Sequence, residues 1–347
     1  MLESTVKKIL NAAVYGAAKA TSLDEAASLS KKLANRVMIK REDLQSVFSF
    51  KIRGAFNKMQ QLTDEQKKKG VISASAGNHA QGVAESGRIL GVQTTIVMPS
   101  TTPAIKVKSV RDRGGKVILH GDAYDDAFQY SQILMAQKDL TFIHPFDDID
   151  VIAGQGTVAR EILQEVFEPI EAIFIPVGGG GLCAGMAAYI KYLRPEIKII
   201  AVEYEESACL KAALEAGKRV VLDKVGIFAD GVAVAQIGKA PFSILKDHVD
   251  EVVTISAAEI CAAIKDIFDD TRSVAEPAGA LGVAGLKKYV HEHNIRDCNL
   301  IAISTGANMN FDRLRFVAEQ ANLGEQTEAL LAVTISEEAG SFKEFCS

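Results

Sequence analysis

The sequence predicts an α/β protein with two open, mostly parallel twisted sheets that are flanked by helices. Short β-rich runs alternate with longer helical patterns along the chain, which is typical of βαβ units whose parallel sheets are covered on both faces. The predicted strands are too numerous for one compact sheet. A length of 347 residues also suffices for about two domains of ordinary size.

Each predicted strand is a short apolar, β-rich run that ends in small or polar residues. These strands occupy residues 34–42, 70–78, 91–99, 115–121, 140–146, 171–181, 198–205, 250–256 and 299–308. Between them lie segments with the length and apolar period of helices, including residues 79–91, 123–137 and 256–270. We find no repeat and no Pro- or Ser-rich linker, so any domain boundary lies within continuous globular sequence.

The overall composition predicts a cytoplasmic protein without a nucleic-acid or membrane partner. The chain is 48% hydrophobic and 24% charged, with a net charge of −5, so it has no basic surplus to attract polyanions. Its N-terminus lacks the apolar core of a signal peptide, and no apolar run reaches the roughly 18 residues that span a bilayer. The five cysteines are scattered and never form C-x-x-C, which favours a reducing compartment over disulfides or zinc.

The run VFSFKIRGAF (residues 47–56) places Lys51 among aromatic and aliphatic side chains. One interpretation is a solvated helix residue with apolar neighbours. The other is a buried amine, whose pKa is lowered so that more of it is the free nucleophile. On the second interpretation, Ser49 and Gly54 are the small residues that let the chain approach a ligand.

Three loops follow predicted strands and offer groups to bind a ligand. Gly178 to Gly181 precede a helix, an arrangement that suits a phosphate as well as a tight structural turn, and they match neither G-x-G-x-x-G nor a P-loop. The loop SASAGNHAQG (residues 73–82) can wrap an anion, although Asn78 is equally a helix cap and His79 a buried core histidine. STGAN (residues 304–308) lies where ligands of parallel sheets collect. The HEH run at residues 291–293 is not a metal motif.

A phosphate cradle, a buried amine and a polar group for a ring nitrogen are together what pyridoxal phosphate requires of a protein. The segments SFKIRGA, SAGNHAQG, GGGGL, AEPAGAL and TGANMNF occur in that order and resemble the threonine dehydratases, also called threonine ammonia-lyases. These enzymes belong to the group that includes tryptophan synthase β. The resemblance covers essentially the whole chain and is closest to the biosynthetic type. It implies that the cofactor lies in the cleft between two domains.

The resemblance also implies a role for particular residues. Lys51 bonds to the cofactor aldehyde and is the catalytic residue, and Phe50 packs near the cofactor ring. Asn78 binds the phenolic oxygen, and Thr305, where relatives have Ser or Thr, faces the pyridine nitrogen. The phosphate is held by Gly178, Gly179, Gly180, Gly181 and Leu182. The substrate carboxylate is held by Ser75, Ala76, Gly77, Asn78 and His79.

The domain organisation that the resemblance implies has three parts. Residues 1–45 and 153–321 form a large domain that binds the cofactor, and residues 46–152 form a small domain inserted in it. Residues 322–347 are a linker and the start of a regulatory domain of the ACT type, with the run LLAVTISEEAGSF as its first strand and helix. With only that start present, we expect the chain to be insensitive to isoleucine.

The expected activity is conversion of L-threonine to 2-oxobutanoate and ammonia, the first step of isoleucine biosynthesis, with L-serine giving pyruvate. Alternatives are a degradative threonine/serine dehydratase, a serine racemase and a non-catalytic nucleotide-binding module. Racemases of this fold resemble the chain but use a Ser where it has Ala76. A cation near Glu203 is considered, but its acidic partner is replaced around Cys209, so no metal is predicted. Relatives imply a homo-oligomer, either a tetramer or a dimer.

Overall fold

The computed structural model describes residues 2–325 and contains two separate sheets. The larger sheet has the order β1-β2-β10-β7-β8-β9, and the smaller has the order β5-β4-β3-β6. All pairings are parallel except that of β1 with β2. The strands are β1 (Leu23–Glu25), β2 (Arg36–Arg41), β3 (Val71–Ala74), β4 (Thr94–Met98), β5 (Lys116–Leu119), β6 (Thr141–Phe142), β7 (Ala172–Pro176), β8 (Lys198–Tyr204), β9 (Glu251–Ile255) and β10 (Asn299–Ser304).

Helices connect the parallel strands and cover both faces of each sheet. They are α1 (Leu2–Leu10), α2 (Ala27–Leu33), α3 (Lys51–Gln60), α4 (Asp64–Lys69), α5 (Asn78–Leu90), α6 (Ala104–Asp112), α7 (Tyr124–Lys138), α8 (Ile149–Glu165), α9 (Gly181–Leu193), α10 (Cys209–Glu215), α11 (Lys239–Leu245), α12 (Ala257–Thr271), α13 (Pro277–His293) and α14 (Leu314–Gly324). Five short 3₁₀ turns are η1 (Val14–Gly16), η2 (Glu42–Leu44), η3 (Glu205–Ser207), η4 (Asp230–Val232) and η5 (Phe311–Arg313). No helix among the described residues is long and apolar enough to span a membrane.

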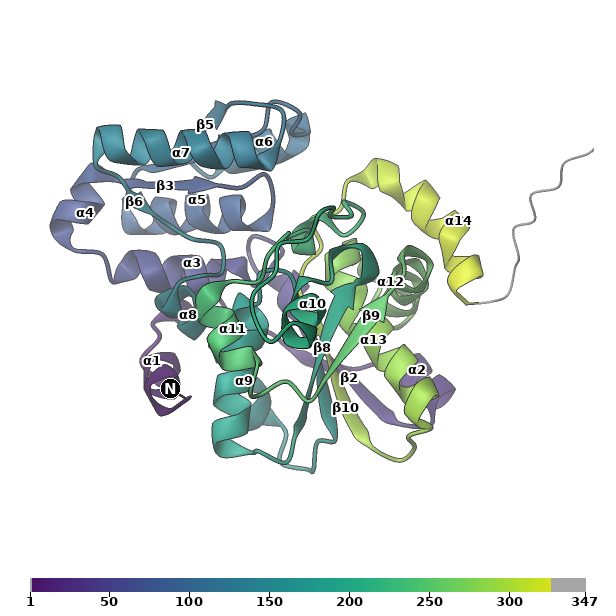
Figure 1. Cartoon of the computed structure of the whole chain (residues 1–347). Helices are drawn as coiled ribbons and strands as arrows, with labels where there is room; N and C mark the ends of the chain where they lie inside the picture. Colours follow the sequence, from purple (N-terminus) through teal and green to yellow (C-terminus); the bar gives the residue numbers. More distant parts are fainter. Residues whose placement is uncertain (1, 326–347) are drawn as a thin grey trace, which may run out of the picture.

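Each sheet has a core on both of its faces. The larger sheet packs one face against α8 and α9 and the other against α12 and α13. The smaller sheet lies between α5 and α7, at the upper left of Figure 1, with the larger sheet below it and to the right. Helix α3 packs on both α5 and α8, and so lies between the two halves of the molecule. Strands buried on both faces explain the continuous apolar runs of the sequence.

The predicted fold class, two mostly parallel sheets flanked by helices, is confirmed. The structure adds the short antiparallel strand β1 at one edge, where three residues give too little pattern to recognise. It also limits β6 to Thr141–Phe142, although the sequence predicted a longer strand. The predicted domain ends stay a prediction; the end at residue 152 falls inside α8. The expected regulatory segment lies outside the described residues from residue 326 onward.

Three of the predicted loops leave the carboxyl ends of strands. The loop that begins at Ser75 follows β3, the glycine turn follows β7, and Thr305 follows β10. Ligands of parallel sheets bind at this edge because the loops there meet the N-termini of the next helices. Of the three, the loop after β10 is bonded directly to the residue before α3, whose first residue is Lys51.

Candidate active site

The segment that carries Lys51 is attached to the end of β10. Three hydrogen bonds join them, and Ser49 and Gly306 form an isolated β-bridge. The bonds run from Phe50 N to Thr305 O at 3.2 Å, from Ala307 N to Phe48 O at 2.9 Å and from Asn308 Nδ2 to Val47 O at 2.9 Å. Phe48 has φ of +55°, a left-handed conformation that is uncommon for a bulky side chain. The chain thus turns sharply just before α3 and fixes where that helix begins.

Lys51 is half-buried as a residue, and its amine is enclosed by the protein. Among the described residues, Nζ has one hydrogen bond, which it donates to Pro145 O at 3.2 Å. Its Nζ also lies 5.2 Å from the centroid of the Phe50 ring. Burial lowers the pKa of Lys51 from 10.5 to about 8, and the nearby Glu276 carboxylate offsets part of this effect. The positive end of the α3 dipole further disfavours an ammonium at the first helical residue. Lys51 is therefore the buried amine of the two interpretations.

The loop after β3 presents main-chain N–H groups at the start of α5. Gly77 is the residue before the helix, and its N–H donates to Ser75 Oγ at 3.3 Å. The first N–H groups of a helix have no partner within it, and they carry partial positive charge. A Cβ built on Gly77 meets nothing within 4 Å, so the space beside this loop is open. These features suit a carboxylate, as the sequence predicted for this loop.

Asn78 is held by two side chains from other parts of the chain. Its Nδ2 donates to Glu276 Oε1 at 2.5 Å, and its Oδ1 accepts from Asn308 Nδ2 at 2.7 Å. Glu276 is the residue just before α13, and its main-chain N–H donates to Gly306 O at 3.1 Å. The amide is thus fixed in one orientation by groups that lie on the β10 side of the site.

His79 is buried, and its Nε2 lies 2.9 Å from Ile143 O. Burial first, and then the charge of Lys51, lower the pKa of His79 to about 3, so the imidazole is neutral at physiological pH. Its Nδ1 has no hydrogen-bond partner within residues 2–325. The side chain thus joins the start of α5 to the segment that follows β6. The main-chain N–H of His79 lies in the first turn of α5.

The glycine turn leads from β7 into α9. Gly180 has φ of +88°, which only glycine adopts readily, and Gly181 begins the helix, with Leu182 as the next residue of its first turn. A Cβ on Gly179 would approach the Phe146 ring to 2.2 Å, and one on Gly178 would approach Val232 Cα to 2.8 Å. Glycine is therefore required at these positions because Phe146 and Val232 pack directly on the turn. Its suitability for a phosphate rests on the main-chain amides at the start of α9.

Thr305 is buried, with its Oγ1 within 3.1 Å of the Ala278 carbonyl. The neutral hydroxyl that the sequence predicted at this place is thus fixed next to the first turn of α13. Its neighbour Ser304 is also buried, and its Oγ has no partner.

Residues 143–146 connect the separate parts of the site. Ile143 O contacts His79, Pro145 O contacts Lys51, and the Phe146 ring packs on Gly179 of the glycine turn. Lys51, the Asn78 loop, the glycine turn and Thr305 are therefore neighbours, although they are far apart in the sequence.

The sequence analysis missed Glu276, Asn308 and Phe146 as members of this group. Glu276 carried a usable signal, because it is the one carboxylate in the largely apolar run SVAEPAGALG. Lys51 is likewise the one amine in the run VFSFKIRGAF. Asn308 and Phe146 carry no such signal, since polar loop residues and aromatic residues are common. The interpretation of Gly54 was wrong: its missing Cβ makes room for Gln155 and Val151 of α8, not for a ligand.

The residues fit pyridoxal phosphate on observations from the structure itself. An enclosed amine with a lowered pKa is the group that bonds to an aldehyde. The glycine turn at the N-terminus of α9 suits a phosphate. Buried polar atoms without partners, at Ser49 Oγ, His79 Nδ1 and Ser304 Oγ, lie next in the chain to predicted site residues.

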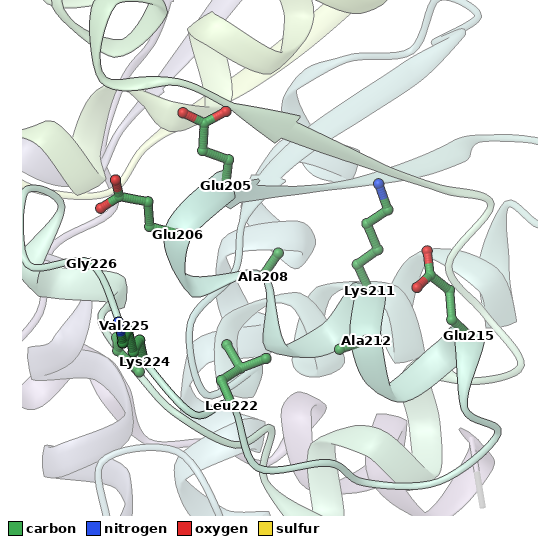
Figure 2. A pocket seen from close by; sticks show the side chains of 10 residues that line it. All are labelled: Glu205, Glu206, Ala208, Lys211, Ala212, Glu215, Leu222, Lys224, Val225 and Gly226. Atoms are coloured by element: carbon green, nitrogen blue, oxygen red, sulfur yellow. The ribbon is translucent and has the colours of Figure 1, made fainter.

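Other candidate regions are separate from this group. A surface hollow of about 680 Å³ lies between α10 and the loop at residues 222–226, and Figure 2 shows that none of the predicted site residues lines it. Both Glu203 oxygens accept main-chain N–H groups, from Leu210 at 2.8 Å and from Lys211 at 2.9 Å. Among residues 2–325, no three His, Cys, Asp or Glu side chains are grouped to hold a metal.

Comparison with known proteins points to the same chemistry. Residues 14–306 match the family described as pyridoxal-phosphate dependent enzyme. The chain is 55% identical to the biosynthetic L-threonine dehydratase of Burkholderia multivorans over 99% of its own length and 68% of that protein's. It is 54% identical to the enzyme of the same name from Escherichia coli, over 98% of the chain and 66% of the relative. The chain thus spans about two thirds of the length of these relatives.

Solved structures agree with the curated relatives. The processed form of threonine deaminase isoform 2 from Solanum lycopersicum superimposes with a TM-score of 0.91 at 46% identity, covering 92% of this chain and 93% of that one. A maize serine racemase gives a TM-score of 0.84 at 29% identity, covering 93% and 99%. Pyridoxal phosphate is the cofactor of this family, as the sequence predicted. The chain belongs to the pyridoxal-phosphate-dependent enzymes and, within them, to the threonine dehydratases of the biosynthetic type.

Proposed function

We propose that this chain carries the catalytic part of a threonine dehydratase, which converts L-threonine to 2-oxobutanoate and ammonia and L-serine to pyruvate. One observation carries the proposal: the Lys51 amine contacts residues 143–146, and the same segment contacts both a loop suited to a carboxylate and a glycine turn suited to a phosphate. The sequence relatives at 55% and 54% identity, all named for this reaction, support the same substrate.

The chain's own residues have distinct tasks in this reaction. Bound pyridoxal phosphate supplies an electron sink for the bond broken at the substrate's Cα. Lys51 holds the cofactor and, when its amine is free, takes the Cα proton at Nζ as general base. A pKa near 8 leaves a substantial fraction of the amine neutral at physiological pH, which a lysine in water does not achieve. The amides at the start of α5 orient the substrate carboxylate.

Thr305 favours elimination over other reactions of the same cofactor. A carboxylate in its place would hold a proton on the ring nitrogen and stabilise a long-lived carbanion. The neutral hydroxyl beside Ala278 O does this less. Charge that develops at Cα is then discharged by loss of the β-hydroxyl, which leaves as water with one proton, in balance with the proton that Lys51 removed from Cα. The unsaturated amine that remains takes up one water and gives 2-oxobutanoate and ammonia.

Racemisation is the second candidate, because a serine racemase shares this fold at a TM-score of 0.84. Inverting Cα needs a second proton donor on the face opposite to Lys51. Ala76 stands at the place where racemases of this fold have a serine, and its methyl group exchanges no proton. Elimination is therefore the reaction that these side chains support best.

The setting of the reaction follows from the same relationship. The biosynthetic relatives favour a role in making isoleucine over the degradative alternative. The composition supports a cytoplasmic location, and the relatives support small amino acids as substrates and a homodimer or homotetramer as the assembly. Lys51, Phe50, Asn78, Gly178 to Leu182 and Thr305 are proposed to hold the cofactor, and Ser75 to His79 the substrate.

Replacing Lys51 tests this function directly. With pyridoxal phosphate present, the parent chain is expected to form 2-oxobutanoate from threonine, and Lys51→Ala to lose about a thousandfold in rate because it lacks the general base. Lys58→Ala is the matched control, since Lys58 lies on the same helix but its amine forms an ion pair with Asp148 at 2.8 Å. A near-parental rate in Lys51→Ala contradicts the proposal. Serine recovered from the assay is expected to remain the L enantiomer, and accumulation of D-serine would favour the racemase.

A further inference from the structure

Glu276 is a buried carboxylate to which the reaction above assigns no task. It is 3% exposed, and its immediate surroundings leave no room for another side chain. A Cβ on Gly306 would approach Glu276 Oε1 to 2.5 Å, and one on Gly231 would approach it to 3.6 Å. A carboxylate confined in this way is costly unless its oxygens have specific partners.

Its partners belong to the active site. Oε1 accepts the short hydrogen bond from Asn78 Nδ2 at 2.5 Å, and the carboxylate also accepts the main-chain N–H of Asn308. The side chain of Asn308 returns to Asn78 Oδ1 at 2.7 Å. Asn78, Glu276 and Asn308 thus form a closed set of hydrogen bonds. The NH₂ of the Asn78 amide has to face Glu276, because an ionised carboxylate can only accept hydrogen bonds.

The charged groups that face Glu276 come from other elements. They are Lys51 of α3, Lys106 of α6, Asp230 of η4 and, across a small cavity, Arg313 of η5. Burial raises the pKa of Glu276 to about 7, and Asp230 adds to this, while the Asn78 amide and Lys106 oppose it. The cavity of about 10 Å³ that Glu276 lines with Asp230 and Arg313 has room for about one water molecule.

We propose that Glu276 is a positioning residue of the active site: its carboxylate orients the Asn78 amide, and its charge acts on the Lys51 amine. As an anion it favours the ammonium form of Lys51, and as a neutral acid it does not. Glu276 therefore affects two groups at once: the charge of the Lys51 amine, and the orientation of the Asn78 amide that is proposed to bind the cofactor's phenolic oxygen. This inference rests on the proposed function for its biological meaning, but its test does not need turnover.

Glu276→Gln removes the charge and retains the size. The carbonyl of the new amide still accepts from Asn78, but its NH₂ meets the main-chain N–H of Asn308, so the closed set loses a partner. The matched control is Glu292→Gln, an exposed residue near the other end of the same helix. Glu276→Asp is the second variant, because it keeps the charge but withdraws the carboxylate by one methylene.

The first measurement is the pH dependence with which acetic anhydride acetylates Lys51 in cofactor-free protein, read by mass spectrometry and normalised to Lys58. Removing the anion is expected to move the midpoint for Lys51 to lower pH by about one unit in Glu276→Gln. Glu292→Gln is expected to keep the parental midpoint. A midpoint in Glu276→Gln that matches the parent overturns the proposal.

The second measurement is the affinity for pyridoxal phosphate. Both Glu276 variants are expected to bind it about tenfold more weakly, because each breaks at least one hydrogen bond of the closed set that fixes the Asn78 amide. Glu276→Asp keeps the charge, so its midpoint for Lys51 acetylation should stay near that of the parent. This variant therefore tests the orienting role by itself, even if Glu276→Gln fails to fold. Parental affinity in Glu276→Asp contradicts that role. If the parent binds the cofactor but does not convert threonine, the proposed function fails, while these comparisons remain decisive for Glu276.

Discussion

At the scale of single residues, the site depends on ionisable groups kept away from water. Burial lowers the pKa of Lys51 to about 8 and that of His79 to about 3, and it raises that of Glu276 to about 7. Each shift favours the neutral form, because a buried charge loses its hydration. Shifts of this kind, gathered around one loop, are characteristic of functional sites.

His79 should make the fold sensitive to mild acid. Its pKa in the folded protein lies below the ordinary value of 6.5, so the unfolded chain binds a proton that the folded chain does not between about pH 6.5 and 3. The contribution of the neutral His79 imidazole to the free energy of unfolding is fully present above pH 6.5. It is lost as the pH falls below 6.5, at about 1.4 kcal/mol per pH unit.

Denaturant unfolding at pH 7.5 and pH 5 measures this effect. His79→Asn is expected to reduce the loss of unfolding free energy between these two pH values by about 2 kcal/mol relative to the parent. His291→Asn is the control, since His291 is exposed on α13. An unchanged loss in His79→Asn would show that the imidazole titrates alike in both states.

At the scale of elements, a buried network of charges fixes α3 to its neighbours. The Arg53 guanidinium on α3 binds the Glu42 carboxylate of η2 at 2.7 Å and the Glu161 carboxylate of α8 at 2.6 Å. Lys40 of β2 adds an ion pair to Glu161 at 2.8 Å. Arg53 lies two residues after Lys51, so the network that joins β2, η2, α3 and α8 also sets the position of the reactive amine.

Arg53→Met should therefore destabilise the protein strongly, by about 3–5 kcal/mol, because Glu42 would keep its burial without its cation. Arg88→Met serves as the control, since the Arg88 side chain is 57% exposed and pairs with Glu85 three residues away. The unfolding free energy from denaturant titration distinguishes the two variants. A loss below about 1 kcal/mol in Arg53→Met would mean that the network contributes no more than a surface ion pair.

Local pattern predicted most of the elements but not the closest contacts. Strands β7, β8 and β10 are mostly apolar runs, and they are followed by glycine or polar residues that mark the edge where ligands collect. The Glu276–Asn78–Asn308 set could not be predicted in the same way, because its members are separated by 198 and 230 residues in the chain. Periodicity gives the direction of a side chain within an element, and only the folded chain gives its partner.

At the scale of the whole molecule, the two sheets provide the framework and the loops decide the chemistry. A dehydratase and a racemase share this architecture, with TM-scores of 0.91 and 0.84 to the chain, so the fold alone does not select the reaction. Helix α3 connects the two halves, because it packs on α5 of one and α8 of the other (Figure 1). The Lys106–Asp230 ion pair at 2.5 Å is a second link between the halves, next to Glu276.

The central claim is that one buried amine, Lys51, holds the cofactor between these two halves. The most direct test is to add pyridoxal phosphate, reduce the protein with borohydride and locate the pyridoxyl group by peptide mass spectrometry. The account predicts a single labelled peptide with the group on Lys51, and no label in Lys51→Ala. A label on another lysine, or a protein that takes up no label, would contradict it.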